Sequence, residues 1–394
     1  MSRSSYPPPT AAQRALGKRP RVNRFLRILI AVTCIIHVPF VLGALEALRR
    51  AGATDGVRWG VTAALTLVGV GLFVGRARKG MYDTRRSAAF VWLVDIPYFT
   101  HWCACIFTLL PSLVAAIVMA FTGFSPGFFV WVYAIGFALA GYGILVRRWA
   151  FVVRDVEIPV PGLDPKLDGF RIAQLSDLHI GTMTPESWGA RWARAANERA
   201  CDIAVVTGDL VSSGTEFYDD IARVVGRLTA KDGVYVSMGN HDYFGDGEPL
   251  IERLRKSGAS VLRNEGRVIE RDGARLYLAA IDDTWTKRDD LDRALADRPD
   301  GVPTVLLAHD PEKFRDAEKR DVEVVLSGHT HGGQVAVPFL ARRFSLSKIA
   351  HTYTLGLYRR GRSTLYVHPG LGTTGPPVRF GVAPAVVIVT LRAA

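Results

Sequence analysis

The sequence contains few cysteines, with 4 among 394 residues. Three of them, Cys34, Cys103 and Cys105, lie within apolar stretches, and Cys201 stands alone in the C-terminal part. No spacing among them is typical of a disulfide framework or of a structural zinc site. His101 lies close to the Cys103-x-Cys105 pair, but small apolar residues within a membrane span explain this pair better than a metal site does.

Acidic residues are scarce in the first part of the chain. Residues 1–155 contain 18 Lys and Arg but only 5 Asp and Glu, whereas the remainder contains 31 and 32. The net charge of +12 therefore comes from the N-terminal part, where the long apolar runs also lie. Basic residues between apolar runs are typical of membrane topology. The near-neutral C-terminal part lacks the basic footprint of nucleic-acid binding, so no nucleic-acid partner is expected.

Four apolar runs begin at Phe25, Trp59, Tyr98 and Phe128. Most approach the ~20 residues that a helix needs to cross a bilayer, and the second is the shortest. We therefore expect a bundle of about four transmembrane helices over 25–150, preceded by a disordered basic tail over 1–24. The segment AAFVWLVDIPYF before the third run contains Asp95 and a proline. It favours an interfacial segment or a kinked extension of the third span over a fifth crossing.

Lysine and arginine are concentrated in the tail, in the loop between the second and third runs, and after the fourth run. Positive-inside counting places both ends in the cytoplasm. This predicts a multi-pass protein of the inner (plasma) membrane with a cytoplasmic C-terminal domain. A signal peptide is the alternative for the first run, but a clear cleavage site is lacking and three further runs follow. The basic residues are Arg14, Lys18, Arg19, Arg21, Arg24, Arg76, Arg78, Lys79, Arg85, Arg86, Arg147 and Arg148.

From about Asp155, short apolar runs alternate with helical stretches and with turns rich in Gly and Asp. Runs such as GFRIAQLS, CDIAVVT and GVYVSMG read as buried strands, and PESWGARWARAANERA has the pattern of an amphipathic helix. The alternation predicts an α/β domain over 155–394 that binds ligands at its strand ends. The later predicted strands are ARLYLAAI, TVLLAH, VEVVLSG, TLYVHPG and AVVIVTL.

Side chains that can bind metals follow five of these predicted strands, commonly after a glycine. In His329-Thr330-His331 the two imidazoles project to the same side, because side chains alternate along an extended chain. Two Asp, one Asn and four His form a mixed nitrogen and oxygen set that suits Mn, Fe or Zn and lacks the thiolates of structural zinc. The candidate ligands are Asp177, His179, Asp209, Asn240, His309, His329 and His331, with His241 and Asp242 next to Asn240.

The series D-x-H, G-D, G-N-H-D, H and G-H-x-H resembles the motifs of the calcineurin-like metallophosphoesterases. The ending G-H-T-H-G-G-Q is similar to that of the bacterial membrane-anchored branch. The resemblance covers roughly residues 165–392 and implies a two-sheet αβ sandwich with a dinuclear site at the strand ends. It implies one ion on Asp177, His179 and His331, a second ion on Asn240, His309 and His329, and Asp209 as the bridge between them.

The activity implied is metal-dependent hydrolysis of a phosphoester, and we expect a phosphodiesterase that uses two divalent ions (Mn²⁺, Fe²⁺ or Zn²⁺). Two cations ~3.5–4 Å apart lower the pKa of a bridging water and clamp the phosphoryl oxygens, so a bridging hydroxide would attack in line. His241 would stabilise or protonate the leaving oxygen, with Asp242 fixing its ring. Four spans favour a membrane-borne substrate such as a lipid-linked phosphodiester or pyrophosphate.

Two other functions remain open. The substrate could be a soluble phosphoester, with the spans as a plain anchor, or the fold could serve a non-catalytic membrane receptor or regulator. The intact ligand set argues against the receptor, and the near absence of charged or polar residues inside the spans argues against transport. The basic and aromatic segment 338–361 could rest on an anionic leaflet. Residues with either a structural or a site role are Asp282, Asp283, His351, His368 and Arg379.

Overall fold

The computed structural model describes residues 22–78, 83–122, 126–338, 340–341, 343 and 345–394. The chain divides into two compact units. One comprises residues 1–81 and 100–139, and the other comprises residues 82–99 and 140–394. Residues 1–21 of the predicted tail lie outside the described residues.

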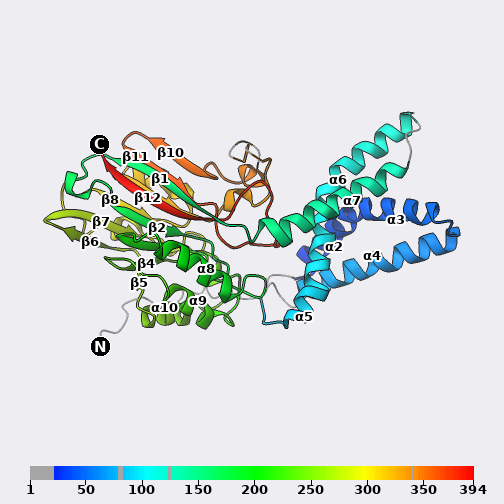
Figure 1. The fold of residues 1–394 in the computed structure, drawn as a ribbon, viewed down its shortest axis with the longest axis horizontal. Helices are drawn as coiled ribbons and strands as arrows, with labels where there is room; N and C mark the ends of the chain where they lie inside the picture. Colours follow the sequence, from blue (N-terminus) through cyan, green and yellow to red (C-terminus); the bar gives the residue numbers. More distant parts are fainter. Residues whose placement is uncertain (1–21, 79–82, 123–125, 339, 342, 344) are drawn as a thin grey trace. The chain divides into compact units, whose positions relative to one another are not determined.

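Long apolar helices dominate the N-terminal part (Figure 1). They are α2 (Val22–Ile36), α3 (Val38–Arg50), α4 (Asp55–Arg78), α5 (Ala88–Phe90), α6 (Ile96–Thr122) and α7 (Gly127–Tyr142). Within the described residues, the stretches Asp55–Arg76, Ala88–Thr122 and Gly127–Arg147 are each long and apolar enough to cross a membrane. Helices α2 and α3 meet with a bend of 40° and would make a fourth span if the bent pair counts as one.

The segment AAFVWLVDIPYF belongs to the Ala88–Thr122 span. Helix α5 continues through a π-helical turn, η1 (Val91–Asp95), directly into α6. Large apolar side chains are exposed along the helices, including Leu67 in α4, Phe121 in α6 (86% exposed) and Trp131 in α7. Such a density of exposed apolar surface is typical of helices that face lipid rather than water.

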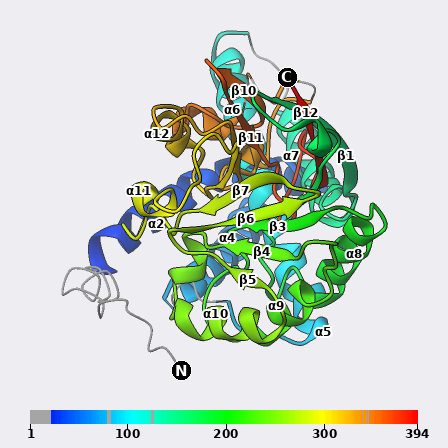
Figure 2. The ribbon, with the colours of Figure 1, turned by 90° about the vertical axis from the view of Figure 1, so that its left-hand side faces the viewer.

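The second unit contains two six-stranded sheets (Figures 1 and 2). The strands are β1 (Val152–Val160), β2 (Arg171–Leu175), β3 (Ile203–Thr207), β4 (Val234–Ser237), β5 (Ser260–Val261), β6 (Glu265–Arg271), β7 (Ala274–Ala280), β8 (Thr304–Leu307), β9 (Val324–Ser327), β10 (Gly356–Arg360), β11 (Ser363–Val367) and β12 (Ala385–Ala393). The first sheet has the order β1-β12-β2-β3-β4-β5 and the second β10-β11-β9-β8-β7-β6. The central strands of both sheets are parallel.

Apolar side chains pack in three layers around these sheets. Residues such as Val205 in β3 and Leu326 in β9 fill the space between the sheets. Helices α8 (Glu186–Asn197), α9 (Tyr218–Val225) and α10 (Gly247–Lys256) cover the outer face of the first sheet, and α11 (Leu291–Ala294) and α12 (Phe314–Glu318) that of the second. The central strands are therefore buried on both faces, which explains their continuous apolar sequences. The predicted two-sheet αβ sandwich is confirmed.

The eight predicted strands correspond to β2, β3, β4, β7, β8, β9, β11 and β12. Strand β1 was not predicted, because it lies at the edge of its sheet and exposes charged side chains. Its buried residues Val156, Ile158 and Val160 alternate with Glu157 and other partly or fully exposed residues. Alternation of this kind is typical of an edge strand with one face in the core, and it is a weaker signal than a continuous apolar run.

Candidate metal centre

The candidate ligands lie where strands of both sheets end. Asp177 and His179 follow β2, Asp209 follows β3 and Asn240 follows β4, and these three strands are neighbours in the first sheet. The ligands of the second sheet, His309, His329 and His331, follow its neighbouring strands β8 and β9. Because the strands within each set are parallel, their carboxyl ends meet at one edge, and this edge is where open α/β sheets bind ligands.

The structure brings six of the seven candidate ligands into two groups that share Asp209. The first group contains Asp177, His179, Asp209 and His331, and the second contains Asp209, His309 and His329. Within each group, the ligand atoms lie within 4.8 Å of one another. In the second group, His309 Nε2 lies 3.2 Å from Asp209 Oδ2. A carboxylate common to two groups is the arrangement that a bridged pair of ions requires.

The seventh candidate, Asn240, lies beside the same carboxylate. The backbone N–H of the following residue, His241, donates to Asp209 Oδ1 at 2.9 Å. The Asn240 side chain is buried, and its Oδ1 atom has no hydrogen-bond partner. The buried atom Asp177 Oδ2 also lacks a partner. Buried polar atoms are normally paired, so two unpaired oxygen atoms at one site fit metal ions as their missing partners.

Backbone carbonyls bind one ring nitrogen of His179 and one of His309, which leaves the other nitrogen of each ring for the metal centre. The Nδ1 atom of His179 donates to the carbonyl of Val211 at 3.3 Å, and that of His309 donates to the carbonyl of Thr207 at 2.7 Å. Each ring therefore directs Nε2 toward the site, as metal-binding histidines do. The Nε2 atoms of His179 and His331 lie 3.0 Å apart. Two nitrogens this close would share one cation readily.

Burial keeps most of the imidazoles neutral, which is the form that binds metal. Burial lowers the pKa of His179 to about 3 and that of His329 to about 4. His309 differs: burial disfavours its charged form, but the Asp209 carboxylate outweighs burial and raises the pKa of His309 well above its ordinary value. Burial also raises the pKa of Asp177 to about 6. The raised pKa of His309 thus reflects its closeness to Asp209, the carboxylate that both ligand groups share.

The backbone at the site adopts conformations that side chains other than glycine rarely adopt. Five candidate ligands have positive φ, namely Asp177 (53°), His179 (44°), Asp209 (53°), His329 (72°) and His331 (53°). Such conformations cost about 1–3 kcal/mol each and cluster at functional sites. Close packing adds a further constraint at Gly208, where a Cβ would lie 2.6 Å from His309 Nδ1. The fold therefore holds these residues in place at an energetic cost.

His241 lies at the rim of the metal centre and is partly exposed. Its Nδ1 atom donates to the carbonyl of Ser212 at 2.6 Å, and its ring centre lies 4.7 Å from that of His179. Its Nε2 atom forms a long hydrogen bond of 3.4 Å with Thr374 Oγ1. This placement suits a group that exchanges a proton with a bound ligand.

Asp242 does not make the contact that the sequence suggested, because the carbonyl of Ser212 holds the ring of His241. The buried Asp242 carboxylate instead accepts from the backbone N–H groups of Leu210 (2.8 Å) and Gly239 (2.8 Å). It also accepts from the N–H of Asp209 at 3.1 Å. Asp242 therefore ties the loop that carries Asp209 to the loop that carries Asn240 and His241.

Arg379 is fully buried, which excludes a surface cap. Its guanidinium donates to the carbonyls of Pro369 and Gly372, and Nη2 lies 3.3 Å from His331 Nδ1. Its backbone N–H donates to the carbonyl of Gly143 at 3.3 Å, and Gly143 belongs to the Gly127–Arg147 span. Arg379 thus contacts both Gly143, at the end of this span, and the candidate ligand His331.

Other residues named in the sequence lie at different distances from the centre. The ring of His351 lies 5.2 Å from that of His329. His368 is buried, and its Nδ1 atom accepts from the N–H of Gly370 at 2.9 Å. Asp282 pairs with Arg263 at 2.8 Å, and Asp283 accepts from the hydroxyl of Thr286 at 2.7 Å. Of these residues, His351 is the one that faces the metal centre.

Sequence reasoning missed two aromatic residues at the rim. Phe244 is 43% exposed and its ring lies 4.4 Å from that of His241. Trp285 is 63% exposed and its ring lies 6.1 Å from that of His329. Exposed aromatics beside a polar centre are a signal for ligand contact. In the sequence they look like ordinary loop residues, because their exposure is a tertiary property.

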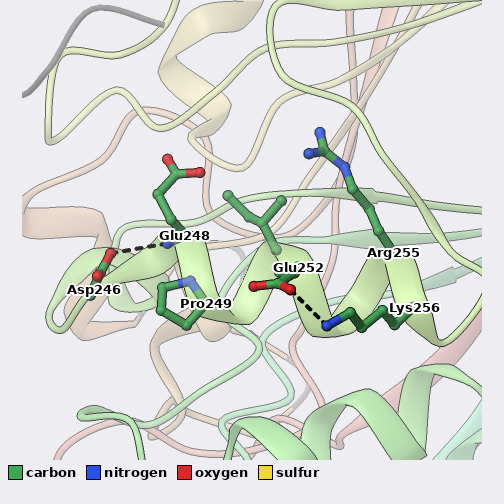
Figure 3. Close-up of a pocket in the computed structure, with 7 residues that line it drawn as sticks. Asp246, Glu248, Pro249, Glu252, Arg255 and Lys256 are labelled. Atoms are coloured by element: carbon green, nitrogen blue, oxygen red, sulfur yellow. Dashed lines mark hydrogen bonds and ion pairs between the residues drawn. The ribbon is translucent and has the colours of Figure 1, made fainter. Parts of the chain in front are cut away.

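A hollow along α10 lies outside the metal centre (Figure 3). The residues that line it come from this helix and the residue before it, and Lys256 and Glu252 form an ion pair of 2.6 Å there. None of the candidate ligands lines this hollow. It resembles an ordinary solvated helix surface rather than a reaction site.

Comparisons with known proteins agree with the geometry of the metal centre. The profile of the family described as "Calcineurin-like phosphoesterase" matches residues 170–333. A Danio rerio protein named "Transmembrane protein with metallophosphoesterase domain" is 33% identical over 270 residues, which are 65% of this chain and 61% of that protein. The "Uncharacterized metallophosphoesterase YkuE" of Bacillus subtilis is 31% identical over 229 residues, which are 57% of this chain and 80% of that protein.

Solved structures add little to these sequence matches. The chain of "Structural and Functional Characterization of a Novel Archaeal Phosphodiesterase" is 15% identical with a TM-score of 0.28, over 51% of this chain and 83% of its own. That score is low, so the family assignment rests on the sequence matches. The chain spans about three fifths of the length of the Danio rerio relative.

Proposed function

Because this chain belongs to the family of calcineurin-like metallophosphoesterases, we propose that it is a metal-dependent phosphoesterase. The observation that carries the proposal is the pair of ligand groups sharing Asp209. Two divalent ions (Mn²⁺, Fe²⁺ or Zn²⁺) would polarise the phosphoryl oxygens and activate the attacking water when bound. Hydrolysis of a nitrophenyl phosphodiester by the purified full chain, lost on chelation and regained with Mn²⁺, tests the proposal. The proposed ligands are Asp177, His179 and His331 for one ion, Asn240, His309 and His329 for the other, and Asp209 for both.

The proton-transfer step is assigned to His241. Its Nδ1–H is held by the carbonyl of Ser212, so Nε2 is the atom that faces a bound substrate. A protonated Nε2 can donate to the leaving oxygen as its bond to phosphorus breaks. Asp242 takes the role of a positioning residue, because its carboxylate joins the loops that carry Asp209 and Asn240.

The chain is proposed to lie in the inner (plasma) membrane, with residues 1–24 as a tail, 25–150 as the membrane region and 155–394 as a cytoplasmic catalytic domain. Three or four apolar helices support membrane association. The Danio rerio and Bos taurus relatives named as transmembrane proteins also support it. Lys and Arg are concentrated in the tail, in the loop after α4 and after the last span. This distribution supports a cytoplasmic catalytic domain.

A cysteine-labelling experiment tests this topology. Cys34 is exposed and is first replaced by Ala, whereas Cys103, Cys105 and Cys201 are buried. In that background, a cysteine at the exposed Thr122 should react with a membrane-impermeant maleimide on intact cells. A cysteine at the exposed Arg362 should react only after the cells are permeabilised. Labelling of Arg362→Cys on intact cells would place the catalytic domain on the other side.

The substrate is proposed to be a lipid-linked phosphodiester or pyrophosphate. The exposed aromatics Phe244 and Trp285 flank the centre, and Ile349, in the segment 338–361, is 87% exposed. Gly143, at the end of a candidate span, bonds to Arg379, which contacts His331. Apolar groups and a span end beside the metal centre suit a phosphate presented at a bilayer surface. A soluble phosphoester with the spans as a plain anchor is the alternative.

Basic residues of the segment 338–361 separate these alternatives. Arg343→Gln combined with Lys348→Gln removes two exposed positive charges. Each such charge contributes about 1 kcal/mol to binding at an anionic leaflet. We expect hydrolysis of a phosphodiester lipid in anionic vesicles to fall about tenfold or more, with no change for a soluble nitrophenyl phosphodiester. The matched control is Arg315→Gln combined with Lys319→Gln, at exposed positions in α12 and directly after it. Equal losses for both substrates would show that the segment is structural.

A further inference from the structure

Residues Asp83–Arg86 lie between the candidate spans Asp55–Arg76 and Ala88–Thr122, and we call them the connector. The connector belongs to the same compact unit as the metal centre. It is docked against two loops of that unit. One loop, residues 180–184, follows the candidate ligand His179, and the other, residues 211–216, follows β3 and Asp209.

Asp83 bonds to both loops. Its backbone N–H donates to Ser213 Oγ at 2.8 Å, and its Oδ2 accepts from the backbone N–H of Thr182 at 2.8 Å. The hydroxyl of Thr182 in turn donates to the carbonyl of Thr84. The Asp83 side chain is largely buried by these contacts. A single residue of the connector therefore joins loops that β2 and β3 carry.

Further contacts hold the connector on either side of Asp83. The N–H of Arg85 donates to Glu216 at 2.8 Å, and its guanidinium pairs with Asp220 at 2.7 Å. Arg86 donates to both carboxylate oxygens of the buried Asp95, at 2.7 and 2.8 Å. Asp95 belongs to the Ala88–Thr122 span, so the connector is tied to the catalytic unit and to the start of a span.

The two loops also hold residues of the metal centre. Ser212, next to Ser213, accepts the Nδ1–H of His241 with its carbonyl, and its hydroxyl donates to the carbonyl of His179 at 2.8 Å. There is no spare room between the loops and the connector, because a Cβ on Gly181 would overlap both Asp83 Oδ2 and Ser212 Oγ. The backbone N–H of Ser212 also donates to the carbonyl of Ile180 at 3.1 Å, so a shift of the 180–184 loop would reach the residue whose carbonyl orients His241.

We propose that Asp83 is a positioning residue for His241. Its carboxylate fixes Thr182 and with it the loop 180–184, to which Ser212 bonds and on which the direction of His241 Nε2 depends. The bond from the backbone N–H of Asp83 to Ser213 is the same for any residue at this position. The inference rests on the proposed function, in which His241 assists departure of the leaving oxygen. The connector, which lies between two spans, would then help to orient a residue of the domain that follows the last span.

The test compares leaving groups in the purified full chain. Removal of His241 assistance should matter most for a poor leaving group, because a good one departs without a proton. We expect Asp83→Ala to lower kcat about tenfold or more for a methyl phosphodiester, and much less for a nitrophenyl phosphodiester, with two metal ions retained per chain. Asp83→Asn should recover most of the activity, because its amide oxygen can still accept from Thr182. Asp83→Glu, whose longer side chain would press on Gly181, replaces Asp83→Ala if that variant fails to fold.

Two further variants test whether the effect of Asp83→Ala acts through His241. Arg85→Gln keeps the contacts of Asp83 and the backbone bond to Glu216. It removes the guanidinium bonds to the carbonyl of Glu216 and to Asp220, so it should show no dependence on the leaving group. Asp83→Ala combined with His241→Ala should be no slower than His241→Ala alone, because the two act through one group. Equal losses for both leaving groups, or loss of metal, would overturn the inference. If His241→Ala itself shows no dependence on the leaving group, the fault lies in the role proposed for His241.

Discussion

Asp209→Ala is expected to abolish turnover. The carboxylate belongs to both ligand groups, so its removal would weaken the binding of both proposed ions. We expect a loss of at least about 10³-fold, beyond the 10²–10³-fold typical of removing a single oxyanion-hole donor. Metal analysis of the purified variant should find fewer than two ions per chain. The rate and the metal content should fall together, because both depend on the same oxygen atoms.

The matched control for this variant is Asp283→Asn. Asp283 is also a buried carboxylate beyond the end of a strand, β7, but it bonds to Thr286 and belongs to neither ligand group. We expect two ions per chain and a rate close to that of the unaltered protein. Circular dichroism should show that both variants are folded. Full activity and full metal content in Asp209→Ala would mean that the ions, if any, bind elsewhere.

The second large effect is expected for His241→Ala. Its ring lies beside the ligands without belonging to either group, so both ions should remain bound. Turnover of a phosphodiester with a poor leaving group should fall roughly 10²–10⁴-fold, as is typical for loss of a general acid. This corresponds to about 3–5 kcal/mol of transition-state stabilisation. With nitrophenol as the leaving group, the loss should shrink.

His351→Ala provides the comparison for this histidine. His351 also lies near the centre, with its ring 5.2 Å from that of His329. Its removal should cause a smaller loss that does not depend on the leaving group. Loss of metal from His241→Ala would identify His241 as a ligand. A loss that is equal for all leaving groups would contradict a role in proton transfer.

The sequence indicates the metal centre because ligands that are distant along the chain share one local context, the end of an apolar strand. Parallel pairing then brings the ends of β2, β3 and β4 together. The contacts of Asp242 could not be predicted in this way. Its neighbour His241 suggests a pair, but the folded chain offers backbone N–H groups of the Asp209 loop that need an acceptor.

Docking between distant segments was equally hidden from the sequence. In the sequence, Arg85 looks like a topology determinant, because basic loops are typical of the cytoplasmic side, and Asp83 belongs to no motif. Their partners Ser213 and Glu216 lie more than 100 residues later in a loop of ordinary composition. Neither periodicity nor motif spacing carries information about such a contact. The left-handed backbone at Asp177 and Asp209 is another such feature, since neither residue type requires it.

The position of β12 has a consequence for how the protein is made. Strand β1 follows the last span and has β12 as its neighbour in the sheet, and β12 also pairs with β2. A ribosome completes β12 only after it has made every other strand. Until then β1 and β2 present unpaired edges, and pairings between such distant segments form slowly. Unpaired edges favour aggregation, so the growing chain is exposed to aggregation until β12 has been synthesised. The first sheet can therefore close only after the apolar helices and the earlier described strands have been synthesised.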